Sequence, residues 1–232
     1  MLPASHHPKK HAVIMTIYQE PALQILRAVA SVRRHEPSYP VVVVSDGISR
    51  PDVALKADRL GFRFVAGDHL KSLPKAASWW TRFFGEGLAE GTDYLLKLDP
   101  DAFFWRPFRT VPPGDYYGTV QSLGNVVSIQ GGCQGFSRKA ALHIMESGFC
   151  DDHLMANPHV WYPDRAAAEW MRSTDYLSTD WTIGHIAACL DILPVDWSEV
   201  RSVWREPVSN PDLKYAVTHP YKEPISIIEA LQ

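Results

Sequence analysis

The residues best suited to chemistry in this chain lie in the segment DYLLKLDPDAFF, at positions 93–104. An apolar run ends at Leu98, and two carboxylates, Asp99 and Asp101, follow it two residues apart. Carboxylates at the end of a buried strand are unfavourable unless their charge is neutralised, and a divalent cation with oxygen ligands neutralises it. Such a cation also binds a diphosphate. The alternative is a strand followed by an ordinary Asp-Pro turn without a chemical role.

A third carboxylate of interest is Asp180, in the segment STDWTIGHIAA at positions 178–188. Ser178 or Thr179 is a suitable N-cap for a helix here, which places Asp180 in the first turn. There the helix dipole stabilises a negative charge, and this alone is one explanation of the residue. The other is a carboxylate that points from a helix start into a pocket and acts as a general base.

Two further residues near the C-terminus belong to the segment YAVTHPYKEP. His219 follows a short apolar stretch, and Lys222 lies three residues beyond it. The pair offers an imidazole to a metal and an ammonium to a phosphate. The alternative for an isolated histidine is a structural role.

A glycine-rich segment, QGGCQGFSR, occupies positions 130–138. Gly131, Gly132 and Gly135 would allow the backbone to approach a ligand closely. The spacing matches neither the phosphate-binding loop nor the dinucleotide-binding pattern. In the alternative interpretation, Ser137 only caps a helix over residues 139–146.

The elements that must position these residues alternate along the first half of the chain. Hydrophobic spacing predicts strands at 11–17, 41–44, 62–65 and 94–98, and helices at 21–34, 51–60 and 75–89. This alternation is typical of a largely parallel sheet with helices on both faces. Ligands bind such sheets at the carboxyl ends of the strands, and Asp46 and Asp99 both fall at that edge.

The second half is less regular. Strands are expected at 116–121 and 126–129, joined by a turn at Gly124-Asn125. The polar segment 151–165 is interpreted as a loop over the site. Residues 1–10 are expected to form a flexible N-terminus, and the absence of repeats and linkers predicts one domain over residues 11–232.

Composition excludes several classes of function. A formal net charge of −3 argues against nucleic-acid binding, which needs a basic face. No apolar window reaches the length of a membrane span, and the N-terminus lacks the apolar core of a signal peptide. The three cysteines show no ligand spacing, which predicts reduced thiols in a cytoplasmic protein. Peripheral association with a membrane stays compatible with these observations.

In the order of these features, the chain resembles the nucleotide-sugar-dependent glycosyltransferases of the GT-A fold, which carry an Asp-x-Asp motif. The resemblance covers residues 12–224. It rests on Thr16-Ile17-Tyr18, Ser45-Asp46-Gly47, Asp99-Pro100-Asp101, the glycine-rich segment, Thr179-Asp180-Trp181-Thr182-Ile183-Gly184 and His219. The later order is similar to that of inverting enzymes, including fringe-like β-glycosyltransferases. Those carry a Glu-Asp pair before a small helix, and Thr179 stands here in place of the Glu.

The resemblance implies an α/β GT-A fold, with a Rossmann-like, mostly parallel central sheet and a smaller C-terminal region on the acceptor side. It also implies Mn²⁺ or Mg²⁺, held by Asp101 with Asp99 and His219, at the diphosphate of a nucleoside diphosphate sugar. Asp99 is alternatively a ligand of the ribose hydroxyls. The remaining implied contacts are Thr16, Tyr18 and Asp46 around the base and ribose, and Lys222, with Lys75 or Arg82, at the phosphates.

The implied activity is sugar transfer of the hexosyltransferase class, with inversion of the donor's configuration. Asp180 is the candidate base, and Asp151, Asp152 and Asp175 are alternatives. The acceptor would be a glycan, a lipid-linked intermediate or a small molecule. The alternatives are a retaining enzyme and a non-catalytic protein of the same fold that binds a carbohydrate or nucleotide. An aspartyl-phosphate phosphatase fits less well, since its two-Asp motif follows the first strand of the sheet. A sugar nucleotidyltransferase also fits less well, because it needs a Gly- and Arg-rich loop after that strand.

Overall fold

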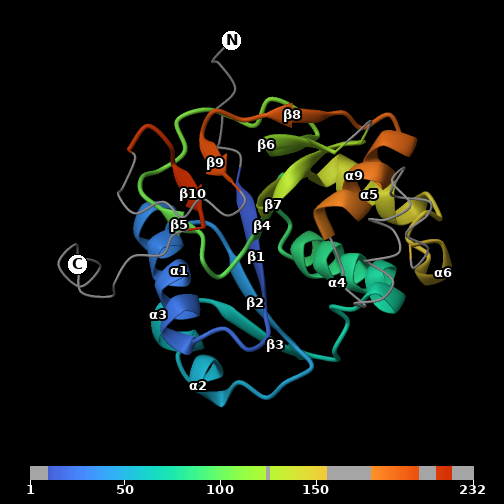
Figure 1. Cartoon of the computed structure of the whole chain (residues 1–232). Helices are drawn as coiled ribbons and strands as arrows, with labels where there is room; N and C mark the ends of the chain where they lie inside the picture. The colour runs from blue at the N-terminus through green and yellow to red at the C-terminus, as the bar shows by residue number, and fades with distance from the viewer. Residues whose placement is uncertain (1–9, 124–125, 156–178, 204–212, 221–232) are drawn as a thin grey trace, which may run out of the picture.

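A seven-stranded sheet forms the centre of the molecule (Figure 1). The computed structural model describes residues 10–123, 126–155, 179–203 and 213–220. The strands of the central sheet are β1 His11–Ile17, β2 Val41–Asp46, β3 Arg63–Gly67, β4 Tyr94–Leu98, β6 Tyr116–Leu123, β7 Val126–Ser137 and β8 Pro194–Asp196. Their spatial order is β3-β2-β1-β4-β7-β6-β8.

Most neighbouring strands of this sheet run parallel. The pairs β1–β2, β1–β4, β2–β3 and β6–β8 are parallel, whereas β7 is antiparallel to both β4 and β6. The valine run of β2 is buried along its whole length, as expected for a parallel strand covered on both faces. The structure confirms the predicted α/β fold of the GT-A, Rossmann-like type.

Helices cover both faces of the sheet (Figure 1). On one face lies α1 Ala22–His35, whose buried side chains pack with those of β1 and β2. On the other face lie α4 Ala76–Ala89, α5 Arg138–Glu146 and α9 Thr179–Cys189. The aromatic side chains of α4 fill the core on this side, together with Phe136 of β7.

A second, three-stranded sheet joins distant parts of the chain. Its strands are β5 Phe103–Phe104, β9 Val200–Ser202 and β10 Val217–His219, in the order β5-β10-β9. Because β5 begins two residues after Asp101 and pairs with β10, it brings the end of β10 beside the Asp-x-Asp motif.

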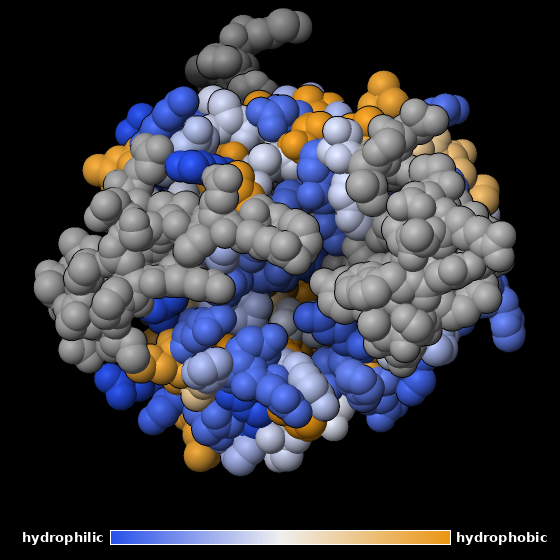
Figure 2. Space-filling model, viewed as in Figure 1, coloured by the Kyte–Doolittle hydropathy of each residue, from blue (hydrophilic) through white to orange (hydrophobic). Residues whose placement is uncertain are grey.

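On the face drawn in Figure 2 the described surface is mainly hydrophilic, with apolar residues scattered over it. All three cysteines are free. Within the described part of the chain, no helix combines the length and apolar character needed to cross a membrane.

Two predicted elements differ from the structure. The single helix expected over residues 51–60 is two short ones, α2 Pro51–Ala54 and α3 Ala57–Leu60. Val53 of α2 is buried, whereas Leu55, between the two helices, is 81% exposed. The strand expected at 126–129 is longer in the structure, because β7 continues through the glycine-rich segment to Ser137.

The helix after β7 is capped as the structural alternative predicted. Ser137 Oγ accepts a hydrogen bond from the Ala140 N–H at 3.0 Å, and its own hydroxyl donates to Asp115 at 2.6 Å. Two short elements, the 3₁₀ helix η1 Leu73–Lys75 and the helix α6 Asp152–Met155, adjoin the start of α4. The predicted flexible end 1–10, apart from Lys10, and the turn Gly124-Asn125 lie outside the described residues.

Candidate active site

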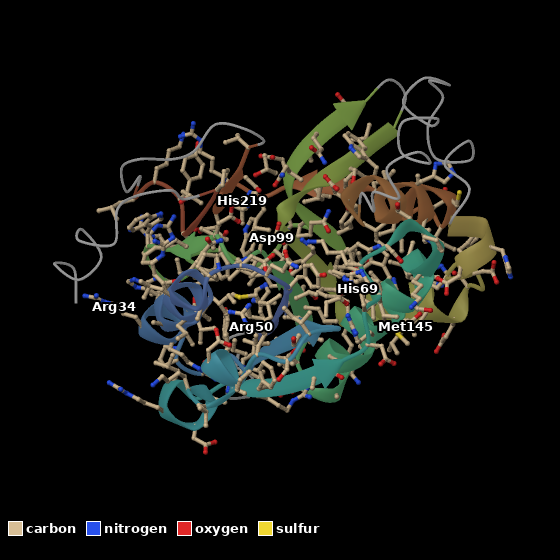
Figure 3. All side chains as sticks on the ribbon, turned by 60° about the horizontal axis from the view of Figure 1, so that its bottom comes forward. Arg34, Arg50, His69, Asp99, Met145 and His219 are labelled. Atoms are coloured by element: carbon tan, nitrogen blue, oxygen red, sulfur yellow. The ribbon has the colours of Figure 1, made fainter. Side chains whose placement is uncertain are left out.

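Three of the predicted residues meet in one cluster at the carboxyl end of β4. His219 Nε2 lies 3.1 Å from Asp101 Oδ1 and 3.8 Å from Asp99 Oδ2. One ligand atom from each of the three residues lies within 4.8 Å of the others. Figure 3 shows Asp99 and His219 close together at this edge. The Asp-x-Asp motif and the histidine therefore form one site, although more than a hundred residues separate them in sequence.

A tight turn holds the two aspartates. The Asp99 N–H donates to the Gly132 carbonyl at 2.9 Å, and the Ala102 N–H donates to the Asp99 carbonyl at 3.0 Å. The first bond extends the pairing of β4 with β7, and the second closes the turn over Pro100. The backbone thus presents both carboxylates on the same side as the imidazole.

The donor set fits a divalent cation. Two carboxylates and one imidazole suit Mn²⁺ well, because carboxylates bind hard cations and imidazole is a usual ligand of first-row transition metals. Mg²⁺ prefers oxygen ligands only, so the histidine favours Mn²⁺ of the two predicted ions. Within the described residues, this is the group of three or more acidic, His or Cys side chains that meets metal-ligand spacing.

A buried lysine, which the sequence analysis did not single out, supports the first aspartate. Lys97 Nζ donates to Asp99 Oδ1 at 2.5 Å and also to the Gly131 carbonyl. Burial alone raises the pKa of Asp99, but the positive charges of Lys97, His219 and Lys71 outweigh it and lower the pKa overall. Asp99 is therefore held as a carboxylate. The signal in the sequence was a lysine inside the apolar strand YLLKL.

The glycines of β7 make room for side chains of this protein. A Cβ at Gly132 would lie closer to Nδ1 of the His219 ring than two non-bonded atoms can approach. A Cβ at Gly131 would lie 3.3 Å from Cγ of Asp180. Neighbouring residues of a strand face opposite sides, so the two glycines admit the two candidate functional side chains on opposite faces of β7. The predicted close approach of a ligand to this backbone stays a prediction.

Asp180 lies in the first turn of α9, as predicted. Its Oδ2 accepts a hydrogen bond from Gln121 Nε2 at 2.7 Å, and its carbonyl accepts one from Ser128 Oγ. Lys97 connects Asp99 with the carbonyl of Gly131, and the Asp180 side chain lies beside the Cα of the same glycine. The half-buried Asp180 carboxylate is thus connected to the cation cluster by strand β7 and by Lys97.

One alternative base has a structural partner instead. Asp152 Oδ1 accepts from the N–H groups of Ala77 and Ser78, at 2.8 and 3.0 Å, and Oδ2 accepts from the Ser78 hydroxyl at 2.6 Å. Both oxygens are therefore bound to the N-terminal turn of α4. Asp175 lies outside the described residues.

Asp46 is fully buried at the end of β2, where it anchors the segment after β3. Its carboxylate accepts from His69 Nδ1 at 2.7 Å, from the N–H groups of Leu70 and Lys71 at 3.0 Å each, and from Arg82. Burial raises the pKa of Asp46, but these backbone donors and Arg82 lower it overall. Contact of Asp46 itself with a nucleotide stays a prediction.

The other predicted nucleotide residues lie nearby or outside the described chain. Thr16 is half-buried near the end of β1, and Tyr18 follows that strand. The Tyr18 ring lies 5.3 Å from the His69 ring, centroid to centroid. Lys75 Nζ donates to the His69 carbonyl at 3.1 Å. Lys222 lies outside the described residues.

This fold and this cluster define the class: the chain has the fold of the GT-A glycosyltransferases. It is similar to the galactosyltransferase LgtC, solved in complex with donor and acceptor sugar analogs, with a TM-score of 0.53 and 14% identity over 90% of this chain and 86% of that one. An active-site mutant of LgtC gives a TM-score of 0.52 and 15% identity over 92% and 88%. No protein-family model matches the chain, and no curated protein matches its sequence.

Proposed function

We propose that this protein is a metal-dependent glycosyltransferase that moves a sugar from a nucleoside diphosphate sugar to an acceptor hydroxyl. The observation that carries the proposal is the cluster of Asp99, Asp101 and His219, at the strand edge where α/β sheets bind ligands. The likeness in fold to a galactosyltransferase that binds donor and acceptor sugar analogs supports it. The acceptor would be a glycan, a lipid-linked intermediate or a small molecule, and the expected location is the cytoplasm.

The chemical need is to stabilise a leaving diphosphate. When bound by Asp99, Asp101 and His219, Mn²⁺ or Mg²⁺ would supply positive charge where negative charge develops on that diphosphate. Lys97 occupies one oxygen of Asp99 and leaves the other directed toward His219. Lys97 thereby fixes the orientation of this carboxylate before any ligand binds.

The nucleoside would lie along the ends of β1 and β2. Tyr18 offers a ring face for the base, and Thr16 offers a hydroxyl for the base or ribose. Asp46 would act mainly by holding the segment with His69 in place, because its oxygens already have four protein donors. Lys222 would neutralise phosphate charge.

Asp180 is the proposed general base. Its carboxylate would take the proton of the acceptor hydroxyl as that oxygen attacks the sugar, and Gln121 holds it in position. Attack on the face opposite the leaving group would invert the anomeric configuration. Retention is the alternative outcome, and the anomeric configuration of the product distinguishes the two.

The direct test is thermal unfolding with Mn²⁺ and a nucleoside diphosphate. At a hundred times Kd, linkage stabilises the folded state by about 2.7 kcal/mol, which raises Tm by roughly 5–10 °C for a chain of this size. The test uses UDP and GDP in turn, and Asp101→Ala should abolish the joint shift. A wild-type shift in Asp101→Ala would remove this residue from the cation site.

Turnover separates an enzyme from a binding protein of the same fold. We expect the wild type to release sugar from at least one member of a panel of nucleotide sugars, and only with Mn²⁺ or Mg²⁺ present. A joint thermal shift without sugar release across the panel, with acceptors of each proposed class, would favour the non-catalytic alternative. The same chain, residues 11–232, is proposed to act as one domain.

A further inference from the structure

The second nitrogen of His219 enters a buried chain of side chains behind the candidate cation site. His219 Nδ1 lies 3.0 Å from Ser202 Oγ, its direct neighbour in the pairing of β10 with β9. Ser202 Oγ also contacts Gln130 Oε1, which accepts from the Gly132 N–H at 2.8 Å. Ser202 is 1% exposed and Gln130 7%, so this network is closed to bulk water.

The hydrogen bonds of this chain have a fixed direction. The atom of Gln130 that receives the Gly132 N–H must be its oxygen, and an amide oxygen only accepts. The Ser202 hydroxyl therefore donates to Gln130, and its oxygen is left to accept from His219. His219 must then carry a proton on Nδ1, so the form of the ring that binds a cation has its lone pair on Nε2.

The backbone holds each member of the chain in place. The Ser202 N–H donates to Thr119 Oγ1 at 2.8 Å, and the Val203 N–H donates to the His219 carbonyl at 3.0 Å. On the far side of the ring, Nε2 lies 3.1 Å from Asp101 Oδ1. The imidazole is thus held between a neutral acceptor at one nitrogen and the carboxylates at the other.

We propose that Ser202 and Gln130 are positioning residues that keep the His219 proton on Nδ1 and present Nε2 to the cation. The inference rests on the proposed function, because it needs a cation at Asp99, Asp101 and His219. Hydrogen-bond partners behind a metal-bound histidine fix its tautomer and ring orientation, and their loss typically weakens metal binding about 10–100-fold. The glycine-rich segment acquires a role here, since it supplies both Gln130 and the Gly132 N–H.

The experiment measures Mn²⁺ affinity in the presence of UDP or GDP, whichever gives the joint thermal shift, by calorimetry or electron paramagnetic resonance. Gln130→Met removes the acceptor at nearly constant volume, whereas Gln130→Glu keeps an oxygen at that position. We expect about 10–100-fold weaker binding for Gln130→Met and Ser202→Ala, and no loss for Gln130→Glu. Ser137→Ala, a buried serine at the opposite end of β7, is the control and should bind Mn²⁺ like the wild type.

A double-mutant cycle separates positioning from general packing. In a His219→Ala background, Gln130→Met should weaken Mn²⁺ binding no further, because its effect acts through the imidazole. An equal loss with and without His219 would overturn the proposal, as would unchanged affinity in Gln130→Met. The cycle decides the question even if Gln130→Glu fails to fold. Absence of Mn²⁺ binding by the wild type would instead refute the cation site itself, and with it the proposed function.

Discussion

His11 gives the sharpest test of how the core of this protein responds to pH. It is the first residue of β1, is 2% exposed, and neither ring nitrogen has a hydrogen-bond partner among the described residues. Aromatic rings surround it at centroid distances between 5.2 and 6.0 Å: Tyr39, Tyr94, Phe108, Tyr117 and Trp197. Burial in this apolar cage lowers the pKa of His11 from 6.5 to about 3.

The sign of the effect follows from the difference between the two states. The unfolded chain binds the His11 proton near pH 6.5, and the folded chain binds it only near pH 3. The free energy of unfolding is therefore unaffected well above pH 6.5 and falls as the pH drops from 6.5 toward 3. At 1.36 kcal/mol per pH unit, the loss is about 2 kcal/mol at pH 5 and about 5 kcal/mol below pH 3.

Replacing the imidazole with a ring that cannot titrate should remove this loss. Between pH 7.5 and pH 5, His11→Phe should lose about 2 kcal/mol less unfolding free energy than the wild type, measured by urea denaturation. Carboxylates, including Glu36, whose pKa is raised by burial, are present in both proteins, so their effects cancel in the comparison. Burial also lowers the pKa values of His35 and His185, but both are present in the two proteins, so their effects cancel in the comparison.

The control is His143→Gln, which removes an exposed imidazole from α5 without touching the cage. Its pH dependence should follow the wild type. If wild type and His11→Phe lost stability in parallel between pH 7.5 and pH 5, the buried neutral state of His11 would be refuted.

Three further predictions follow from the site and its supports. Gly132→Ala should abolish the Mn²⁺-linked thermal shift, because the new Cβ would displace the His219 ring. Gly131→Ala should keep the shift, since its Cβ would lie 3.3 Å from its nearest neighbour, an atom of Asp180. Equal shifts in both variants would contradict this prediction. Asp180→Asn should lower turnover by about a hundredfold or more, with donor affinity nearly unchanged in titration, and the wild-type product should show an inverted anomer by proton NMR. Near-normal turnover or a retained anomer would exclude Asp180 as an inverting base. Ser137→Ala should lower the free energy of unfolding by about 1 kcal/mol in urea, and an unchanged midpoint would deny the cap a stabilising role.

Local patterns in the sequence account for much of the sheet and its helices. The apolar runs of β1, β2 and β4 and the helical spacing of α1 and α4 were predicted within a few residues. Such patterns suffice because burial of one face or of a whole strand imposes a period that a short window reveals. Asp99 was placed at a strand end by the same reasoning, and the cap at Ser137 by its residue type.

Prediction from short stretches of sequence failed where the backbone conformation depends on neighbouring strands. Nothing within residues 130–137 distinguishes a ligand-binding loop from a strand lined with glycines. The strand forms because β4 and β6 pair with it on both sides, and the glycines are needed because the His219 and Tyr117 rings occupy the space beside them. The division of the helix expected over residues 51–60 into α2 and α3 was likewise not predicted.

The sequence by itself determined the candidate ligands, Asp99, Asp101 and His219, and the alternating architecture that carries the first two. Only the tertiary structure decided that β10 pairs with β5 and so brings His219 to the aspartates. It also decided that Lys97 binds Asp99 and that Ser202 links Gln130 to the imidazole. These contacts join strands that lie far apart in sequence, and their geometry depends on strand register, which packing of the whole sheet sets and no local pattern encodes.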